Sequence, residues 1–182
     1  IMGPFRYVPF MECRHSVYSM RHRVNGRLRV NGTDYNFQNG VGYLEGDRGR
    51  SFPNHYVWTQ CCFPGGSLML SAAEIPLGPG CFTGVIGVVQ LEGKEYRLAT
   101  YLGAKVAGIG GNKITVRQGG LVFTASLLEK KAFSLQAPVA GAMGRMIKEN
   151  VSCRACYRFS KNGRTLLDFE TQNASFEYEY PC

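Results

Sequence analysis

The segment from residue 40 to residue 60 holds the densest group of side chains able to do chemistry. It carries two acids, Glu45 and Asp47, and the only tryptophan of the chain, Trp58. A carboxylic acid can donate a proton, and an aromatic ring can stabilise the cation that the proton transfer creates. No other segment of the chain concentrates so many groups able to do chemistry. The glycines of the segment and Pro53 predict a shaped loop between two strands.

Of the two acids, Glu45 is the better candidate for the proton donor. Asp47 adjoins Arg48 and lies close to Arg50, and a neighbouring cation keeps a carboxyl group ionised. We therefore expect Asp47 to form an ion pair that braces the loop. Glu45 shares a side with Tyr43 if the strand continues through both residues, although an ordinary carboxylate at a strand end would fit the same position.

The strand after the loop offers candidate substrate-binding residues. Trp58 alternates with Tyr56 and Gln60, so one face of that strand would carry two aromatic rings and an amide. Such a face could contact a cation and orient a phenol. The same face could also be an ordinary part of the core.

Histidine is the remaining candidate for proton transfer. His22 could relay a proton, although a lone histidine among apolar residues is more often a hydrogen-bonded core group. His15 and His55 do not form a metal-ligand spacing with it, so we expect no metal site.

Turn-forming pairs recur along the chain, with strand-like segments between them. That rhythm predicts an all-β, antiparallel fold with little helix. A closed barrel is the favoured form because closure removes edge strands. Only residues 127–133 and 144–150 could hold short helical turns. The turn pairs are Asn25-Gly26, Asn31-Gly32, Asn39-Gly40, Gly65-Gly66, Gly93-Lys94, Gly110-Gly111, Gly119-Gly120 and Asn162-Gly163.

The register of the first hairpin follows from keeping one face apolar. A loop at Asn25 to Arg27 would place Val24 opposite Leu28 and His22 opposite Val30. His22 would then point inward, and the neighbouring arginines would point outward. Later turns predict the pairs Leu28–Tyr35, Leu91–Tyr96, Val89–Leu98 and Phe159–Leu166. The inner face would then either enclose an apolar ligand or form a filled core.

Composition limits the remaining classes of function. The 182 residues suit one domain, and no apolar run approaches the roughly 20 residues of a membrane-spanning helix. The net charge of +8 raises nucleic acid or acidic lipid as partners. Because the predicted register places the aromatic rings away from the outer arginines, we expect no nucleic-acid binding. Contact with a membrane surface stays open.

The seven cysteines are an odd number without regular spacing. Buried thiols in a reducing compartment explain them most simply, so we expect a cytoplasmic protein. Cys153 and Cys156 have a redox spacing, but they lie in a strand-like run in which positions three apart point to opposite faces.

The central segment also resembles a known family. Tyr43, an acid, the run from Asp47 to Pro53 and the run from Tyr56 to Gln60 resemble the signature of the tocopherol cyclase family. Further similar segments are His15 to His22, Gly93 to Tyr96, Ala99 to Tyr101 and Ala137-Pro138.

This resemblance implies a lipocalin-like barrel that spans residues 1–182 and forms the C-terminal half of a longer two-barrel protein. The missing N-terminal half would then be a partner. The implied activity is that of an isomerase or intramolecular lyase, which closes a ring on a prenylated quinol or related isoprenoid by protonating an alkene. Glu45 and Asp47 would be the catalytic residues, Tyr43, Trp58, Gln60 and His22 would bind the substrate, and no cofactor is needed. The alternative is a non-catalytic carrier of an apolar small molecule.

Overall fold

The fold is all-β and antiparallel, as the sequence predicts. The computed structural model describes residues 1–9, 11–77, 79–129 and 132–180. Two short 3-10 helices, η1 (Gly3–Tyr7) and η2 (Thr100–Leu102), accompany the strands in this part of the chain. The strands are β1 (Cys13–Val30), β2 (Thr33–Gly49), β3 (Tyr56–Phe63), β4 (Gly66–Leu77), β5 (Gly80–Leu91), β6 (Lys94–Ala99), β7 (Lys105–Gly110), β8 (Lys113–Gln118), β9 (Leu121–Leu127), β10 (Phe133–Val139), β11 (Ala142–Lys161) and β12 (Arg164–Tyr178).

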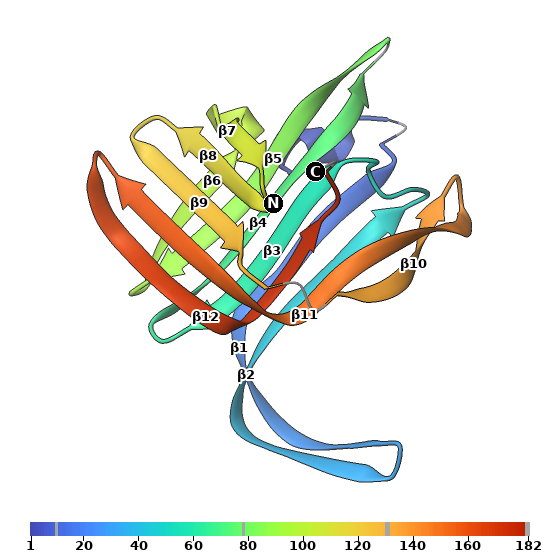
Figure 1. The fold of residues 1–182 in the computed structure, drawn as a ribbon, viewed down its shortest axis with the longest axis vertical. Coiled ribbons are helices and arrows are strands. Elements are labelled where there is room, and N and C mark those ends of the chain that lie inside the picture. Colours follow the sequence, from blue (N-terminus) through green and yellow to red (C-terminus); the bar gives the residue numbers. More distant parts are fainter. Residues whose placement is uncertain (10, 78, 130–131, 181–182) are drawn as a thin grey trace.

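Ten of these strands form one curved sheet (Figure 1). Its order is β6-β5-β4-β3-β12-β11-β9-β8-β7, and β10 pairs with β11. Within the described residues no ladder joins the end strands β6 and β7. The side chain of Gln118 links β8 to β6 instead: the Ala99 N–H donates to its Oε1 at 2.9 Å, and its Nε2–H donates to the Arg97 carbonyl at 2.9 Å.

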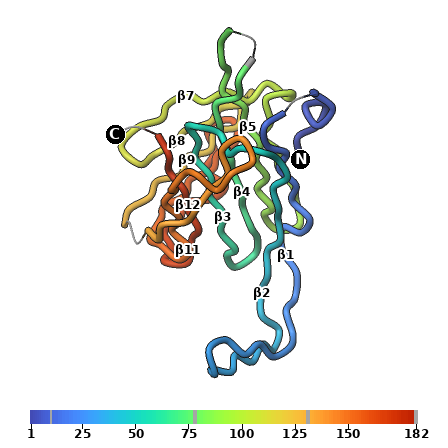
Figure 2. The backbone as a smooth tube through the Cα atoms, turned by 90° about the vertical axis from the view of Figure 1, so that its right-hand side faces the viewer, coloured from blue at the N-terminus to red at the C-terminus, as the bar shows by residue number. Residues whose placement is uncertain are grey.

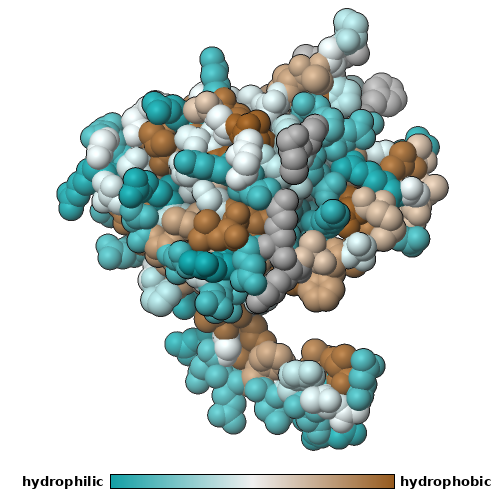
Figure 3. Space-filling model, viewed as in Figure 1, coloured by the Kyte–Doolittle hydropathy of each residue, from teal (hydrophilic) through white to brown (hydrophobic). Residues whose placement is uncertain are grey.

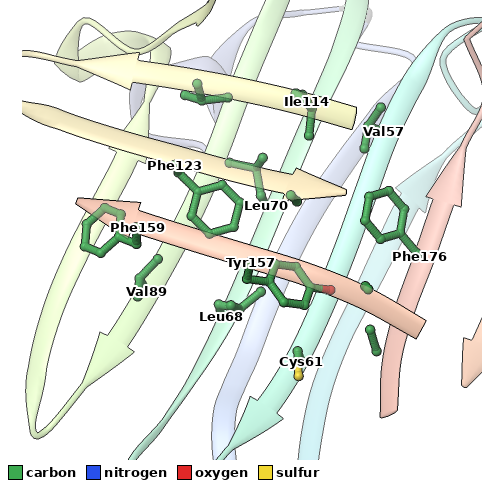
Figure 4. Close-up of a cluster of buried hydrophobic side chains, with 14 of the residues drawn as sticks. Val57, Cys61, Leu68, Leu70, Val89, Ile114, Phe123, Tyr157, Phe159 and Phe176 are labelled. Carbon is green, nitrogen blue, oxygen red and sulfur yellow. The ribbon is translucent and has the colours of Figure 1, made fainter. Parts of the chain in front are cut away.

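The inner face of the sheet is a packed core (Figure 4). Alternation along β3 points Val57, Thr59 and Cys61 inward, where each is fully buried. One buried polar contact crosses this core, between Thr59 Oγ1 and the Tyr157 hydroxyl at 2.6 Å. Of the two alternatives for the inner face, the structure therefore has the filled core. Its largest fully buried members include Leu68, Leu70, Phe123, Tyr157, Phe159 and Phe176.

Strands β1 and β2 form a separate two-stranded ribbon. The base of the ribbon lies against the outer face of the large sheet, where Met20 packs with Met69 and Val88. The remainder projects away from the body of the protein (Figures 1 and 2). The outer face of the sheet is therefore partly covered.

Some predicted registers are wrong. The first hairpin turn is at Asn31-Gly32, which confirms the pair Leu28–Tyr35, whereas β1 continues through Asn25 and Gly26 with a register shift in place of a turn. Val24 consequently pairs with Gly40 and His22 with Gly42, on an exposed part of the ribbon. Three later pairs also differ from prediction. Val89 pairs with Tyr96 and Leu91 with Lys94, and Phe159 pairs with Leu167, next to a register shift.

The predicted helical turns do not form. Residues 144–150 belong to β11, and the described part of 127–133 contains no helix. In the described part of the chain, no helix is long and apolar enough to cross a membrane. The described cysteines are all free thiols, and Cys153 is buried whereas Cys156 on the other face of β11 is partly exposed; Cys182 lies outside the described residues.

Candidate functional site

A polar pocket of about 100 Å³ lies between the ribbon and the outer face of the large sheet. The ribbon supplies its acids and a histidine, β3 and β12 supply aromatic rings and a third acid, and the connection before β3 closes one side. The residues that line it are His15, Glu45, Asp47, Phe52, Pro53, Tyr56, Trp58, Ser71 and Glu177.

His15 joins the two acids of the ribbon. It lies opposite Asp47 in the β1–β2 ladder, and its Nδ1–H donates to Asp47 Oδ1 at 2.8 Å. Its Nε2 lies 3.0 Å from Glu45 Oε2, at ion-pair distance but without the alignment of a hydrogen bond. Burial alone would lower the pKa of His15, but the two acids outweigh burial and raise this pKa to about 9. His15 is therefore a cation at neutral pH.

Glu45 is held from both sides. The Tyr43 hydroxyl donates to its Oε2 at 2.5 Å, and the His15 ring lies on the same oxygen. Burial and the negative charge of Glu45 raise the pKa of the Tyr43 hydroxyl well above its usual value, so the phenol keeps its proton. Glu45 thus has a phenol and an imidazole ring on the same carboxylate oxygen. The ion pair expected of Asp47 forms, but with His15 rather than with a neighbouring arginine.

Glu177 is the acid that β12 contributes to the pocket. Burial in the pocket raises the pKa of Glu177 to about 7, and the charges of Glu149, Asp47 and Glu45 act in the same direction. A hydrogen bond from the Tyr56 hydroxyl to Glu177 Oε2 opposes this rise only in part. A carboxyl group with a pKa near the working pH suits general acid catalysis.

Trp58 adds an unused hydrogen-bond donor. Trp58 lies opposite Glu177 in the ladder between β3 and β12. Its indole Nε1–H is buried and has no acceptor among the described residues. Because buried indole N–H groups usually find an acceptor, this donor is available to a bound molecule.

An apolar pocket adjoins the polar one, and the two share His15 and Ser71. It lies under the N-terminal segment, between that segment and the outer face of β4 and β5. Together the two pockets suit a ligand with a polar head and an apolar tail. The apolar lining consists mainly of Met2, Phe5, Met11, Ala73, Ile75, Phe82, Val85 and Ile86.

The structure brings only some of the predicted site residues together. Glu45, Asp47 and Trp58 line the polar pocket, and Tyr43 contacts Glu45 from outside its lining. Gln60 lies further along β3, where its Nε2 approaches the thiol of Cys62 at 3.3 Å. His22 is exposed on the projecting part of the ribbon, with its Nδ1 3.0 Å from Ser19 Oγ.

Sequence reasoning missed His15 and Glu177 as site residues. The alternation of the last strand places Glu177 on the face opposite Phe176, which is correct. No local pattern in the sequence shows that the distant ribbon packs against this face of β12. That His15 and Asp47 lie opposite each other follows only from the pairing of β1 with β2.

Comparison with known proteins found no match to this chain, whether among family models, curated proteins or solved structures.

Proposed function

We propose that the chain is a tocopherol-cyclase-like isomerase that closes a ring on a prenylated quinol or related isoprenoid, with Glu177 as the proton donor. The observation that carries this proposal is the position of the partly buried Glu177 carboxyl group, with a pKa raised to about 7, beside Trp58 in the polar pocket. The same proposal includes membership of the tocopherol cyclase family and a closed lipocalin-like barrel. It also includes a preceding partner barrel and a cytoplasmic location.

The proposed reaction begins with proton transfer from the Glu177 carboxyl group to one carbon of the alkene. The electron pair of the double bond forms the new C–H bond, and the other carbon becomes a tertiary cation. The rings of Phe52, Tyr56 and Trp58 line the pocket in which this cation would form and would stabilise it through their π faces.

The phenol oxygen of the substrate then forms a C–O bond to the cationic carbon, and its proton returns to the Glu177 carboxylate. The product is an isomer of the substrate, so the reaction consumes no oxidant or reductant. The free Nε1–H of Trp58 would donate to an oxygen of the quinol and hold it in reach.

Glu177 fits the role of proton donor better than Glu45. Glu45 accepts a hydrogen bond from Tyr43 and pairs with the cationic His15. Glu177 receives a hydrogen bond on Oε2 from a neutral phenol, Tyr56, which leaves its other oxygen to carry the proton. In this proposal Glu45 and Asp47 act on the reaction through their negative charges, which favour the protonated form of Glu177.

The second candidate is a carrier that binds the same class of ligand without turnover. The observation that favours it is the apolar pocket beside the polar one. A carrier needs both pockets but has no need for a protonated acid.

Incubation with a panel of prenylated quinols distinguishes the two functions. Binding is measured by fluorescence of Trp58, the only tryptophan, and products are identified by mass spectrometry. The variants are Glu177→Gln and, as a matched control on the same strand, the exposed Glu170→Gln. Ring closure by the wild type and the control, lost in Glu177→Gln with binding retained, supports the enzyme. Binding without turnover by all three proteins favours the carrier, and absence of binding contradicts both.

A further inference from the structure

The projecting part of the ribbon, residues 21–42, exposes an apolar surface that the proposed reaction does not use. The cross-strand pairs Leu28–Tyr35, Val30–Thr33 and Gly26–Phe37 place four large apolar side chains on one face of this hairpin. We call Leu28, Val30, Tyr35 and Phe37 the apolar face. Their exposed fractions are 54%, 44%, 50% and 39%, so a large part of each side chain faces solvent.

The other face of the hairpin is polar and mostly basic. Arg27 and Arg29 lie there, paired across the ribbon with Asn36 and Asp34. Asp34, the only acid in residues 21–42, accepts hydrogen bonds from both arginines. With Arg21 and Arg23 the segment has four arginines against one aspartate, a net charge of +3. Figure 3 shows the hydrophobic and hydrophilic residues side by side on this projection.

An exposed apolar face on a thin, basic projection is a costly arrangement unless a partner covers it. A two-stranded ribbon without a covering layer also has little stability of its own. The projecting hairpin therefore fits a docking surface. Its partner would have an apolar interior and a negatively charged surface.

We propose that the hairpin inserts its apolar face into the surface of an anionic lipid bilayer. The apolar and aromatic side chains would enter the boundary between headgroups and acyl chains, while the arginines, only one strand layer away, would contact anionic headgroups. The charge of the segment complements such a surface. Single-stranded nucleic acid fits less well, because it needs aromatic rings beside the arginines, and Tyr35 and Phe37 lie on the opposite face.

The test is cosedimentation of the full chain with phosphatidylcholine vesicles, with and without phosphatidylserine. The wild type is expected to sediment with the anionic vesicles and to be released by added salt. The double variant Leu28→Ser/Phe37→Ser is expected to bind at least roughly tenfold more weakly, because two buried apolar side chains are lost. The control is Phe133→Ser on β10, where the replaced ring is 62% exposed and binding should not change.

Three results would overturn the proposal. The first is a wild type that stays in the supernatant with anionic vesicles although its circular dichroism shows a folded protein. The second is equal binding by the double variant. The third is a dimer that sedimentation velocity detects in the wild type and that the double variant dissolves, because the apolar face would then bind a second copy of the chain.

Discussion

Glu177 and Trp58 lie directly opposite each other in the ladder between β12 and β3. Both side chains therefore project from the outer face of the large sheet into the pocket beneath the ribbon. An acid and an aromatic donor are thus fixed side by side by backbone hydrogen bonds rather than by a loop. This relationship connects the fold to the proposed chemistry.

The partly buried carboxyl group of Glu177 makes the free energy of unfolding depend on pH. The pKa of Glu177 is raised to about 7 in the folded protein, so the folded state holds this proton more tightly than the unfolded state. The resulting stability is present below the unfolded pKa of about 4.3 and is lost as the pH rises through 7. We expect Glu177→Gln to remove a decline on the order of 3 to 4 kcal/mol between these values.

Urea denaturation at a series of pH values measures this effect. Glu170→Gln, which changes an exposed carboxylate of the same strand, should keep the decline of the wild type. A wild type whose stability does not fall over this range would show that Glu177 is not held protonated.

His15 stabilises the ribbon by separating two acids. Its side chain is only 11% exposed, and both ring nitrogens face carboxylates at 2.8 and 3.0 Å. We expect His15→Gln to lower the free energy of unfolding by about 2 kcal/mol, because Glu45 and Asp47 would then repel each other without a cation between them. The exposed His22→Gln is the control and should change stability by less than about 0.5 kcal/mol.

The same histidine gives a second pH signature. Its pKa is raised to about 9, so its contribution is complete below the unfolded pKa of about 6.5 and is lost as the pH rises through 9. His15→Gln should flatten the stability profile in this window, as measured by urea denaturation. A profile that is unchanged in the variant would contradict the ion pairs.

Gly49 allows the base of the ribbon to close. A Cβ atom at this position would lie 2.0 Å from the Glu12 carbonyl oxygen and 2.7 Å from Cys13 Cα, both backbone atoms. We expect Gly49→Ala to destabilise the protein by about 2 kcal/mol or more, because the backbone must shift. In Gly46→Ala the nearest atom is at 3.5 Å, so thermal unfolding should change little. Equal melting temperatures for both variants would count against the close approach.

The Tyr157 hydroxyl tests the filled core. Its oxygen lies 2.6 Å from Thr59 Oγ1 inside the sheet, and Tyr157 is fully buried. Tyr157→Phe should cost about 1 kcal/mol, because the hydroxyl of Thr59 loses a buried partner. The measurement is chemical denaturation, and a loss close to zero would indicate that water reaches this position.

Local turn chemistry accounts for what the sequence predicted well and for one of its failures. Asn31 and Gly32 have φ values of 49° and 81°, as a tight hairpin turn requires. Asn25-Gly26 and Asn39-Gly40 have the same composition, yet they lie near each other across the ribbon. The Asn39 N–H donates to Asn25 Oδ1 at 2.8 Å, and a register shift replaces the two expected turns. The two Asn-Gly pairs, which lie across the ribbon from each other, thus form an irregularity in the ladder instead of two turns.

The candidate site was only half predictable for a similar reason. Glu45, Asp47 and Trp58 lie within one short segment, so their proximity is visible in the sequence. His15 and Glu177 join them through the pairing of β1 with β2 and of β12 with β3. The protonated state of Glu177 depends on its burial under the ribbon, which is a long-range contact that no local periodicity encodes.

Ring closure in D₂O tests the central claim most directly. In the proposed reaction the proton of Glu177 becomes a carbon-bound hydrogen of the product, and Glu177 exchanges its proton with solvent between turnovers. The account predicts a cyclised product that retains one deuterium after return to H₂O, as seen by mass spectrometry, with formation that slows as the pH rises above about 7 and stops in Glu177→Gln. Cyclised product without deuterium, or equal turnover by Glu177→Gln, would contradict it.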